Sequence, residues 1–221
     1  MRELVIDTET TGLDPNDGHR ICEVAVIELV NHLPTGRYFH RYVNPQRDMP
    51  EGALAVHGLT SDFLAKHPVF AAHANELIEF LGSDQLVIHN ADFDLAFLNM
   101  ELKRAGLAAL TQPVVDTLTL ARRKFPGQPA SLDALCRRFA IDLSGREKHG
   151  ARIDGELLAA VYLELIGGRQ PVFDLAHSAA AKAVAAVARM LRPARPHAPS
   201  ADELAAHASF LAKIKTPLWS S

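Results

Sequence analysis

Cysteine is almost absent from the chain, which contains only Cys22 and Cys136 among 221 residues. Two cysteines cannot form a disulfide framework, and their wide separation does not match the paired spacing of a zinc site. This scarcity excludes the class of small, disulfide-rich secreted proteins. It predicts a reduced, cytoplasmic protein.

Long apolar runs are also missing. No stretch reaches the roughly 18 consecutive apolar residues that indicate a membrane-spanning helix. A secretory signal would begin with positive charge followed by an apolar segment, whereas the first residues here include Glu3, Asp7 and Glu9. We therefore expect neither a secretory signal nor a membrane partner.

An excess of positive charge is lacking as well. Residues 1–170 contain 17 Lys and Arg against 23 Asp and Glu, whereas residues 171–221 contain 6 against 3. An acidic body does not hold a polyanion by bulk electrostatics, because nucleic-acid affinity comes largely from contacts between cations and phosphates. If the substrate is nucleic acid, the body needs metal ions and a tether.

Hydrophobic periodicity predicts an α/β domain with a mixed sheet flanked by helices, because antiparallel strands come first and strands then alternate with helices. The predicted strands cover residues 3–8, 21–30, 37–43, 85–89 and 113–116, with a hairpin turn across 31–36. The predicted helices cover residues 70–82, 91–105, 117–124, 131–140 and 150–166, and Asp116 and Ser131 are expected to cap two of them.

Composition changes near residue 168, where we expect the domain of residues 1–168 to end. Residues 169–199 form a predicted linker with an Ala-rich helix and a Pro-rich end. In the tail, residues 200–221, Ser200 and Glu203 form a capping box that predicts a helix with Leu204 and Leu211 on one face. The tail is expected to be flexible, since one short helix is unstable alone.

The first candidate site residues stand at a strand end, in "DTETTG" (7–12). Asp7 and Glu9 are two residues apart, so they share a face of the strand. Two like charges side by side repel, and a bound cation would relieve that repulsion. A solvated strand end followed by a turn is the alternative, and this stretch alone does not decide between them.

Another pair of acids lies in "HNADFD" (89–94). Asn90 suits a helix N-cap, and Asp92 and Asp94 would favour the first turn through the helix dipole. This structural explanation is sufficient for Asp92. Asp94 is different, because Phe97 and Leu98 follow at i+3 and i+4 and place it beside the apolar side of the helix.

The third site lies in "HGARID" (149–154) and the helix that follows. Asp154 shares a helix face with Leu158, Val161 and Leu165, so a carboxylate occupies the stripe that packs into the core. A buried acid is costly, and a metal ion offsets that cost. His149 falls in a loop between two glycines, where an isolated histidine is usually only solvated.

Together the four acids and the histidine indicate metal-dependent phosphodiester hydrolysis. Hard oxygen ligands without a cysteine or histidine cluster suit Mg²⁺ or Mn²⁺. Two such ions activate water and stabilise the leaving oxygen. A mobile His149 would then serve as general base.

The three motifs, in this order and spacing, resemble those of the DEDDh 3′–5′ exonucleases. The resemblance implies a ribonuclease-H-like fold, with Asp7, Glu9, Asp94 and Asp154 binding two divalent metal ions and His149 as general base. It also covers "VHGLTSDFL" (56–64), similar to a substrate-contacting segment of this family. The implied substrate-binding residues are Asp7, Glu9, Thr10, Thr11, Leu13, Glu51, His57 and Asp154.

Further similarity, in "ARRKFPGQPASLDALCRRF" (121–139) and "DELAAH" near the C-terminus, is to the proofreading branch of the same family. It implies a 3′–5′ DNA exonuclease that releases nucleoside 5′-monophosphates from mispaired primer ends. The partners would be DNA 3′ ends and the alpha subunit of a replicative polymerase, bound through Leu204, Leu211 and Trp219. Gln170, Phe173 and Leu175 match a sliding-clamp-binding pattern, and an ordinary linker is the alternative explanation. The sequence does not decide whether a small accessory subunit also binds the catalytic domain.

Three other functions remain as alternatives. The nearest is an RNA-trimming exoribonuclease of the same fold, against which the polymerase-binding tail argues. A haloacid-dehalogenase-type phosphatase would carry a second Asp two residues after the first, and here that residue is Glu9. A catalytically silent polymerase scaffold would be expected to have lost one of the acids or the histidine, and none is missing.

Overall fold

A computed structural model describes residues 1–145, 148–167 and 198–214. The chain divides into two units, Met1–Val172 and Phe173–Ser221, which are described separately. Several predicted features lie outside the described residues. These are the Ala-rich helix, the clamp-binding residues Gln170, Phe173 and Leu175, and Trp219.

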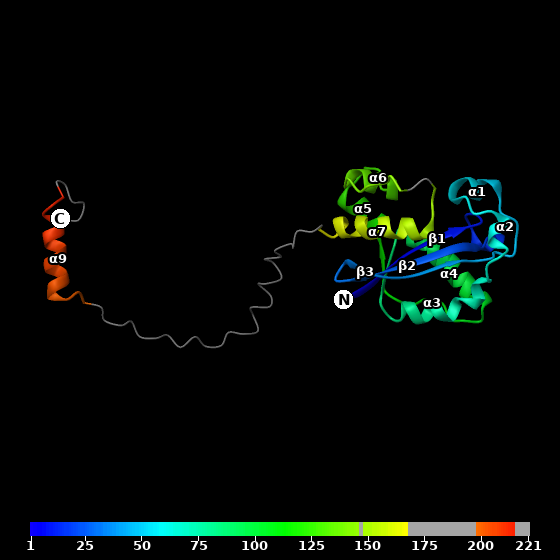
Figure 1. The fold of residues 1–221 in the computed structure, drawn as a ribbon, viewed down its shortest axis with the longest axis horizontal. Coiled ribbons are helices and arrows are strands. Elements are labelled where there is room, and N and C mark those ends of the chain that lie inside the picture. The colour runs from blue at the N-terminus through cyan, green and yellow to red at the C-terminus, as the bar shows by residue number, and fades with distance from the viewer. Residues whose placement is uncertain (146–147, 168–197, 215–221) are drawn as a thin grey trace. The chain divides into compact units, whose positions relative to one another are not determined.

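The first unit is built on one five-stranded sheet with the strand order β3-β2-β1-β4-β5 (Figure 1). β1 pairs antiparallel with β2 and parallel with β4, so the sheet is mixed, as the sequence predicts. The strands are β1 (Arg2–Thr10), β2 (Ile21–Val30), β3 (Leu33–Tyr42), β4 (Gln85–Ile88) and β5 (Val114–Asp116).

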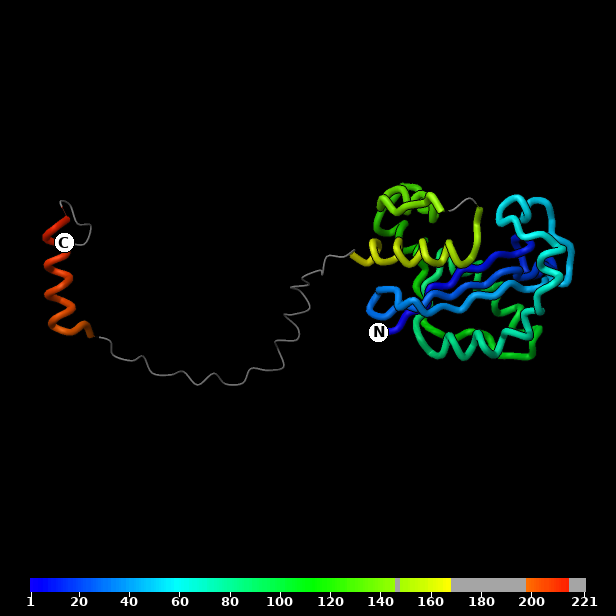
Figure 2. Tube along the Cα trace, viewed as in Figure 1, coloured from blue at the N-terminus to red at the C-terminus, as the bar shows by residue number. Residues whose placement is uncertain are grey.

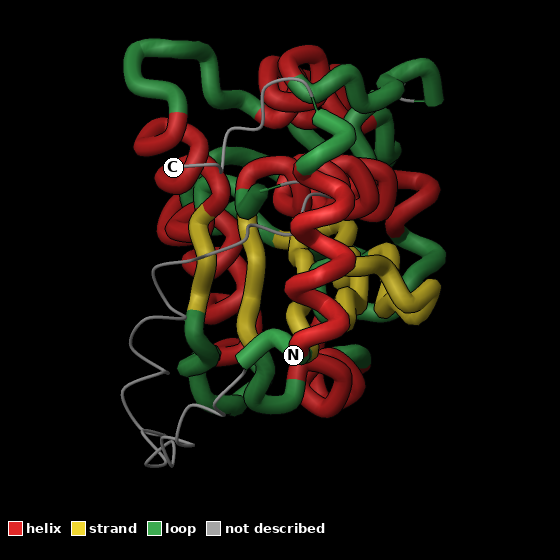
Figure 3. The backbone as a smooth tube through the Cα atoms, turned by 90° about the vertical axis from the view of Figure 1, so that its left-hand side faces the viewer, coloured by secondary structure: helices red, strands yellow, loops and turns green. Residues whose placement is uncertain are grey.

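The helices of this unit form two layers around the sheet (Figure 3). Side chains alternate along β1, so they divide between these two layers. Leu4 and Ile6 belong to the larger core, which holds side chains of α3 and α4, whereas Val5 packs with Leu158 of α7. α5 and α6 pack in turn on the outer side of α7. The helices of this unit are α1 (Glu51–His57), α2 (Ser61–Leu64), α3 (Ala74–Leu81), α4 (Ala91–Arg104), α5 (Thr117–Lys124), α6 (Leu132–Arg138) and α7 (Ala151–Leu165), with short 3₁₀ turns at Pro15–Asp17 and Phe70–Ala72.

All three predicted N-cap positions are confirmed, but only two of these residues form a side-chain cap. Asp116 accepts a hydrogen bond from the amide of Leu118, and Ser131 accepts one from Ala134. Asn90 stands at the N-cap position of α4 but makes no side-chain cap, because its backbone adopts a left-handed conformation at φ 65°. Its own amide donates to Asp116 instead.

The hairpin between β2 and β3 is tighter than the sequence predicts. The chain reverses at Asn31 and His32, both with positive φ, and residues 33–36 already belong to β3. Asn31 tolerates this conformation because its short polar side chain suits the left-handed region. The short helices α1 and α2 were also missed by periodicity, since they are too short to show a repeat.

In the second unit the structure describes α9 (Ala201–Leu211). The predicted capping box is confirmed, since Ser200 accepts from the amide of Glu203 and the Glu203 side chain accepts from the amide of Ser200. Leu204 is exposed on this helix. Within the described parts of the chain, no helix combines the length and the hydrophobicity that crossing a membrane requires.

Candidate active site

The C-terminal end of β1 brings two of the predicted acids to the α7 side of the sheet. Asp7 and Glu9 share the strand face of Val5, which packs against α7. The ladder between β1 and β2 shifts register between Glu9 and Thr10. Such an irregularity redirects the chain at the end of a strand.

The first turn of α7 supplies the facing residues. Asp154 is buried together with Leu158 and Val161, as the helix periodicity predicts. His149 lies just before the helix, and its Nδ1 is 3.0 Å from Asp154 Oδ2. Ligand atoms of Glu9, His149 and Asp154 all lie within 4.8 Å of one another. The structure thus gathers residues 140 positions apart into one cluster.

Asp94 reaches the same region from the other layer. It lies in the first turn of α4 and accepts a 2.7 Å hydrogen bond from the Thr8 hydroxyl of β1. Asp94 is buried whereas Asp92 is exposed, as expected from the apolar residues three and four positions after Asp94. The four acids therefore come from three elements on both sides of the sheet.

The electrostatics of the cluster is unfavourable without cations. Burial, together with the charges of Asp94, Glu9, Asp154 and Glu23, raises the pKa of Asp7 well above its usual value. Burial also raises the pKa of Asp94 to about 7, although hydrogen bonds from Thr8 act in the opposite direction. A positive charge among these groups would restore their ionised form.

The donor set fits hard divalent cations. Carboxylate oxygens predominate in the cluster, and neither of the two buried cysteines, Cys22 and Cys136, belongs to it. Oxygen ligands of this kind suit Mg²⁺ or Mn²⁺, and the charge repulsion at Asp7 is relieved by such an ion. The residues present are thus compatible with the metal ions that the sequence predicts.

A cavity of about 650 Å³ opens beside the acids, between β1, the turn that follows it, and α1. Of the predicted substrate-binding residues, Glu9, Thr10, Thr11, Leu13 and His57 line it. Asp7, Asp154 and Glu51 are not among its lining residues, and Glu51 is exposed in the first turn of α1. Burial lowers the pKa of His57, whose Nδ1 accepts a hydrogen bond from the amide of Leu59.

The turn after β1 is shaped by a close approach of Gly12 to His19. A Cβ atom on Gly12 would lie 2.2 Å from the His19 ring, so only glycine fits without displacing that ring. The Thr10 hydroxyl donates to the carbonyl of Gly12, and the Thr11 hydroxyl accepts from the amide of Arg20. These hydrogen bonds fix the backbone of residues 10–12, which line the cavity.

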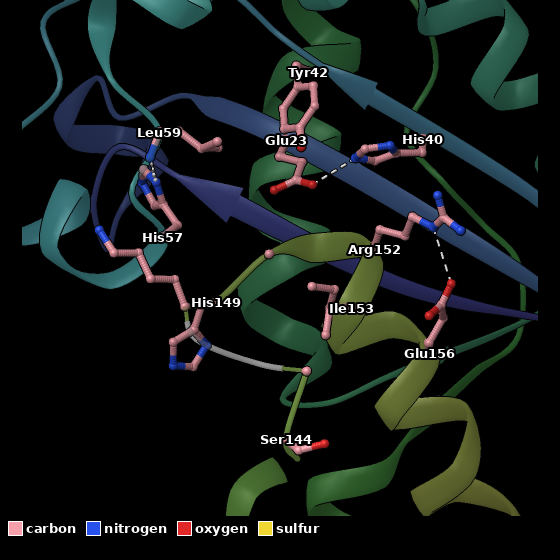
Figure 4. Close-up of a pocket in the computed structure, with 13 residues that line it drawn as sticks. Glu23, His40, Tyr42, His57, Leu59, Ser144, His149, Arg152, Ile153 and Glu156 are labelled. Atoms are coloured by element: carbon pink, nitrogen blue, oxygen red, sulfur yellow. Dashed lines mark hydrogen bonds and ion pairs between the residues drawn. The ribbon is translucent and has the colours of Figure 1, made fainter. Parts of the chain in front are cut away.

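A second cavity of about 680 Å³ lies on the side of His57 and His149 that faces β3 and α7 (Figure 4). The loop before α7 approaches α1 here, as the chain path in Figure 2 indicates, and the amide of His149 donates to the carbonyl of Val56. Glu23 and His40 line this cavity. Sequence reasoning missed both, although an acid within the apolar run "ICEVAVIEL" was a detectable signal.

Residues 4–162 match the model of the RNase_T family of exonucleases. Curated relatives match over most or nearly all of the chain. DNA polymerase III subunit epsilon of Rickettsia prowazekii is 46% identical over 224 residues, covering 97% of both chains. The corresponding subunit of Rickettsia felis is 52% identical over 179 residues, covering 79% of this chain and 78% of its own.

Solved structures share the fold. A structure of exonuclease X in complex with 5′ overhanging duplex DNA matches with a TM-score of 0.58 at 26% identity, covering 74% of this chain and 90% of that one. The nuclease domain of 3′hExo, a DEDDh family member bound to rAMP, matches with a TM-score of 0.62 at 22% identity, covering 77% and 94%. The second match carries information on the fold alone.

Proposed function

Since the chain belongs to the RNase_T family of exonucleases, we propose that it is a 3′–5′ DNA exonuclease that proofreads for a replicative DNA polymerase. Its relatives over nearly the whole length are epsilon subunits of DNA polymerase III, which supports a DNA substrate and a polymerase partner. One observation carries the proposal for this chain. Four carboxylates and His149 converge at the end of β1, beside a cavity large enough for a nucleotide.

Asp7, Glu9, Asp94 and Asp154 are proposed to hold two divalent cations, Mg²⁺ or Mn²⁺. Bound there, the cations would supply a nucleophilic water and neutralise charge on the leaving oxygen. Asp7 is close enough to each of the other three acids that their charges raise the pKa of Asp7. This central position favours Asp7 as the ligand shared by both ions.

His149 is proposed to accept the proton of the attacking water. When Nδ1 donates to Asp154, as the 3.0 Å separation allows, Nε2 keeps the lone pair that a general base needs. The His149 side chain is 47% exposed, so water and substrate can reach the ring. Asp154 would then have two functions, holding a cation and orienting the histidine.

The first cavity is proposed to hold the 3′-terminal nucleotide. Its walls combine apolar contacts from Leu13, Val56 and Phe93 with the polar groups of Thr10 and His57. Apolar surface suits a base, and the few polar groups suit the sugar and phosphate. Glu51 stands outside the lining, and its contact with the substrate stays a prediction of the family resemblance.

Attachment to the replication machinery is proposed to use the C-terminal residues. Leu204 and Leu211 of α9, with Trp219, would bind the polymerase alpha subunit, while Gln170, Phe173 and Leu175 would bind the sliding clamp. Exposure of Leu204 supports a docking role for α9. Helices that present an apolar stripe commonly dock into grooves of a partner.

Polarity and sugar specificity test the proposal directly. Single-stranded oligonucleotides of one sequence would be offered to the purified protein with Mg²⁺, either as DNA or as RNA, and with either the 3′ or the 5′ end chemically blocked. We expect nucleoside 5′-monophosphates from DNA with an open 3′ end only. Faster release from RNA would favour the exoribonuclease alternative, and degradation of 3′-blocked strands would exclude the proposed direction.

A further inference from the structure

Glu23 of β2 is a buried acid that the catalytic proposal does not use. Glu23 is only 3% exposed, and its side chain lies on the α7 side of the sheet. The β1–β2 ladder places it directly opposite Glu9. Like charges directly opposite each other destabilise a sheet, so other interactions of Glu23 must offset this cost.

Those partners are His40 and the start of α7. One carboxylate oxygen of Glu23 lies 2.7 Å from His40 Nε2, and the other accepts a 3.2 Å hydrogen bond from the amide of Ala151. Figure 4 shows Glu23 and His40 side by side at the cavity wall. Both oxygens of the carboxylate are thereby occupied.

The bond to Ala151 replaces a cap that α7 lacks. The first amides of a helix have no partner within the helix, and a side chain at the N-cap usually binds one of them. Here the N-cap is Gly150, which has no side chain and forms no side-chain cap. Glu23 provides an acceptor from the sheet, and its negative charge also suits the positive end of the helix.

This contact lies between the two α7-side groups of the candidate site. His149 precedes Ala151 by two residues and Asp154 follows it by three. We propose that Glu23, held by His40, is a positioning residue that fixes the first turn of α7 so that His149 and Asp154 face Glu9. This inference rests on the proposed function, because the facing arrangement of His149, Asp154 and Glu9 matters only if these residues are catalytic.

Two nearly isosteric substitutions separate the hydrogen bond from the charge. Glu23→Gln keeps an oxygen acceptor for the Ala151 amide, whereas Glu23→Met keeps the length and removes the acceptor. Glu23→Gln keeps polar contacts to both neighbours and is expected to fold. Glu23→Met leaves His40 and the Ala151 amide without their partner, so it is expected to be less stable, and kcat is compared at a temperature where both variants are folded. Glu28→Met is the matched control, because Glu28 is another buried acid of β2 that pairs with Arg2 and Arg37.

The test measures kcat and KM of full-length variants on single-stranded DNA with Mg²⁺, and hydrogen exchange of residues 149–154. We expect Glu23→Met to lower kcat about 10- to 100-fold with KM nearly unchanged, since small displacements of catalytic groups have effects of this size. Exchange at residues 151–154 should accelerate in the same variant. Glu23→Gln should keep kcat within about threefold, and Glu28→Met should keep the wild-type kcat.

Wild-type kcat and exchange in Glu23→Met would overturn the inference, as would an equal loss of kcat in Glu28→Met or in Glu23→Gln. If Glu23→Met does not fold, His40→Ala replaces it, with a smaller loss of kcat and faster exchange at residues 151–154 expected. Wild-type values of both in His40→Ala would then overturn the inference. Exchange does not depend on activity, so an inactive wild-type protein would contradict the proposed function and leave this inference separately testable.

Discussion

At the scale of single residues, burial of the Asp94 carboxyl has a measurable consequence for folding. The pKa of Asp94 is about 7 in the folded chain, against 3.8 for an ordinary aspartate. The folded state therefore binds more protons than the unfolded state between these two values. Stability must then fall as pH rises through this window in the absence of metal.

The corresponding prediction compares wild type with Asp94→Asn in thermal melts with a chelator present. Raising the pH from about 5 to about 8 should lower the Tm of wild type more than that of Asp94→Asn, because asparagine cannot ionise. Saturating Mg²⁺ should reduce the difference by stabilising the charged carboxylates. Parallel Tm curves for the two proteins in the chelator would contradict the raised pKa of Asp94.

A second prediction at this scale concerns His149→Ala. Removal of a general base should lower kcat about 10²- to 10⁴-fold. Affinity for Mn²⁺, measured by calorimetry, should stay close to that of wild type because the four acids are intact. His73→Ala is the matched histidine control and should retain activity. Wild-type kcat in purified His149→Ala would remove this residue from the mechanism.

Individual residues of the candidate site were predictable where their surroundings are local. The burial of Asp94 and Asp154 follows from the apolar residues three to four positions away on the same helix. Glu23 was not predictable in this way, since its partner Ala151 lies 128 residues later. Only the folded sheet brings these two residues together. The catalytic and metal-binding roles themselves stay predictions.

At the scale of elements, Asp116 connects the ends of two parallel strands. One of its oxygens accepts from the amides of Leu118 and Asn90, and the other accepts from the Thr119 hydroxyl. These bonds, which outweigh partial burial, lower the pKa of Asp116. The same side chain thus caps α5 and holds the backbone that leads into α4.

Asp116→Ala should destabilise the domain by about 1 to 2 kcal/mol, the upper range for loss of a helix cap. That loss corresponds to a decrease in Tm of roughly 2 to 8 °C for a domain of this size. Asp92→Ala removes an exposed acid from the first turn of α4 and should change stability by less than about 0.5 kcal/mol. Equal Tm values for the two variants would show that the Asp116 bonds contribute little.

Most elements of the first unit were predicted, including the short β4, β5 and α5, whereas α1 and α2 were missed and β3 begins four residues earlier than predicted. β2, α4 and α7 fall within two residues of their predicted bounds, because ten or more residues display a clear period. α1 and α2 have seven and four residues, and tertiary contacts determine them more than periodicity does. The hairpin turn was misplaced because backbone conformation at Asn31 and His32 is not visible in a hydrophobic pattern.

At the scale of the whole molecule, the predicted family and the mixed sheet are confirmed. Negative charge is concentrated in residues 1–170, which suggests a role for the C-terminal residues as a tether. An acidic exonuclease body binds DNA weakly, and a tether to the polymerase would raise the local concentration of primer ends. The division into residues 1–168, 169–199 and 200–221 stays a prediction.

Deleting residues 200–221 tests this arrangement. The truncated protein should keep its activity on free single strands, since every residue of the candidate site belongs to the first unit. It should no longer copurify with the polymerase alpha subunit. Trp219→Ala in the full-length chain should weaken that association, because tryptophan is a frequent anchor of interfaces. Normal stoichiometry of the truncated protein in the complex would contradict the proposed tether.

The central claim is that the protein hydrolyses nucleotides from mispaired 3′ ends, using divalent metal held by the four acids and His149 as general base. The most direct measurement is release of a labelled 3′-terminal nucleotide from primers with matched or mispaired ends, by wild type and by Asp7→Ala. We predict Mg²⁺-dependent release by wild type that is faster from the mispaired end, and no release by folded Asp7→Ala. Release without divalent metal, or wild-type release by Asp7→Ala, would contradict the claim.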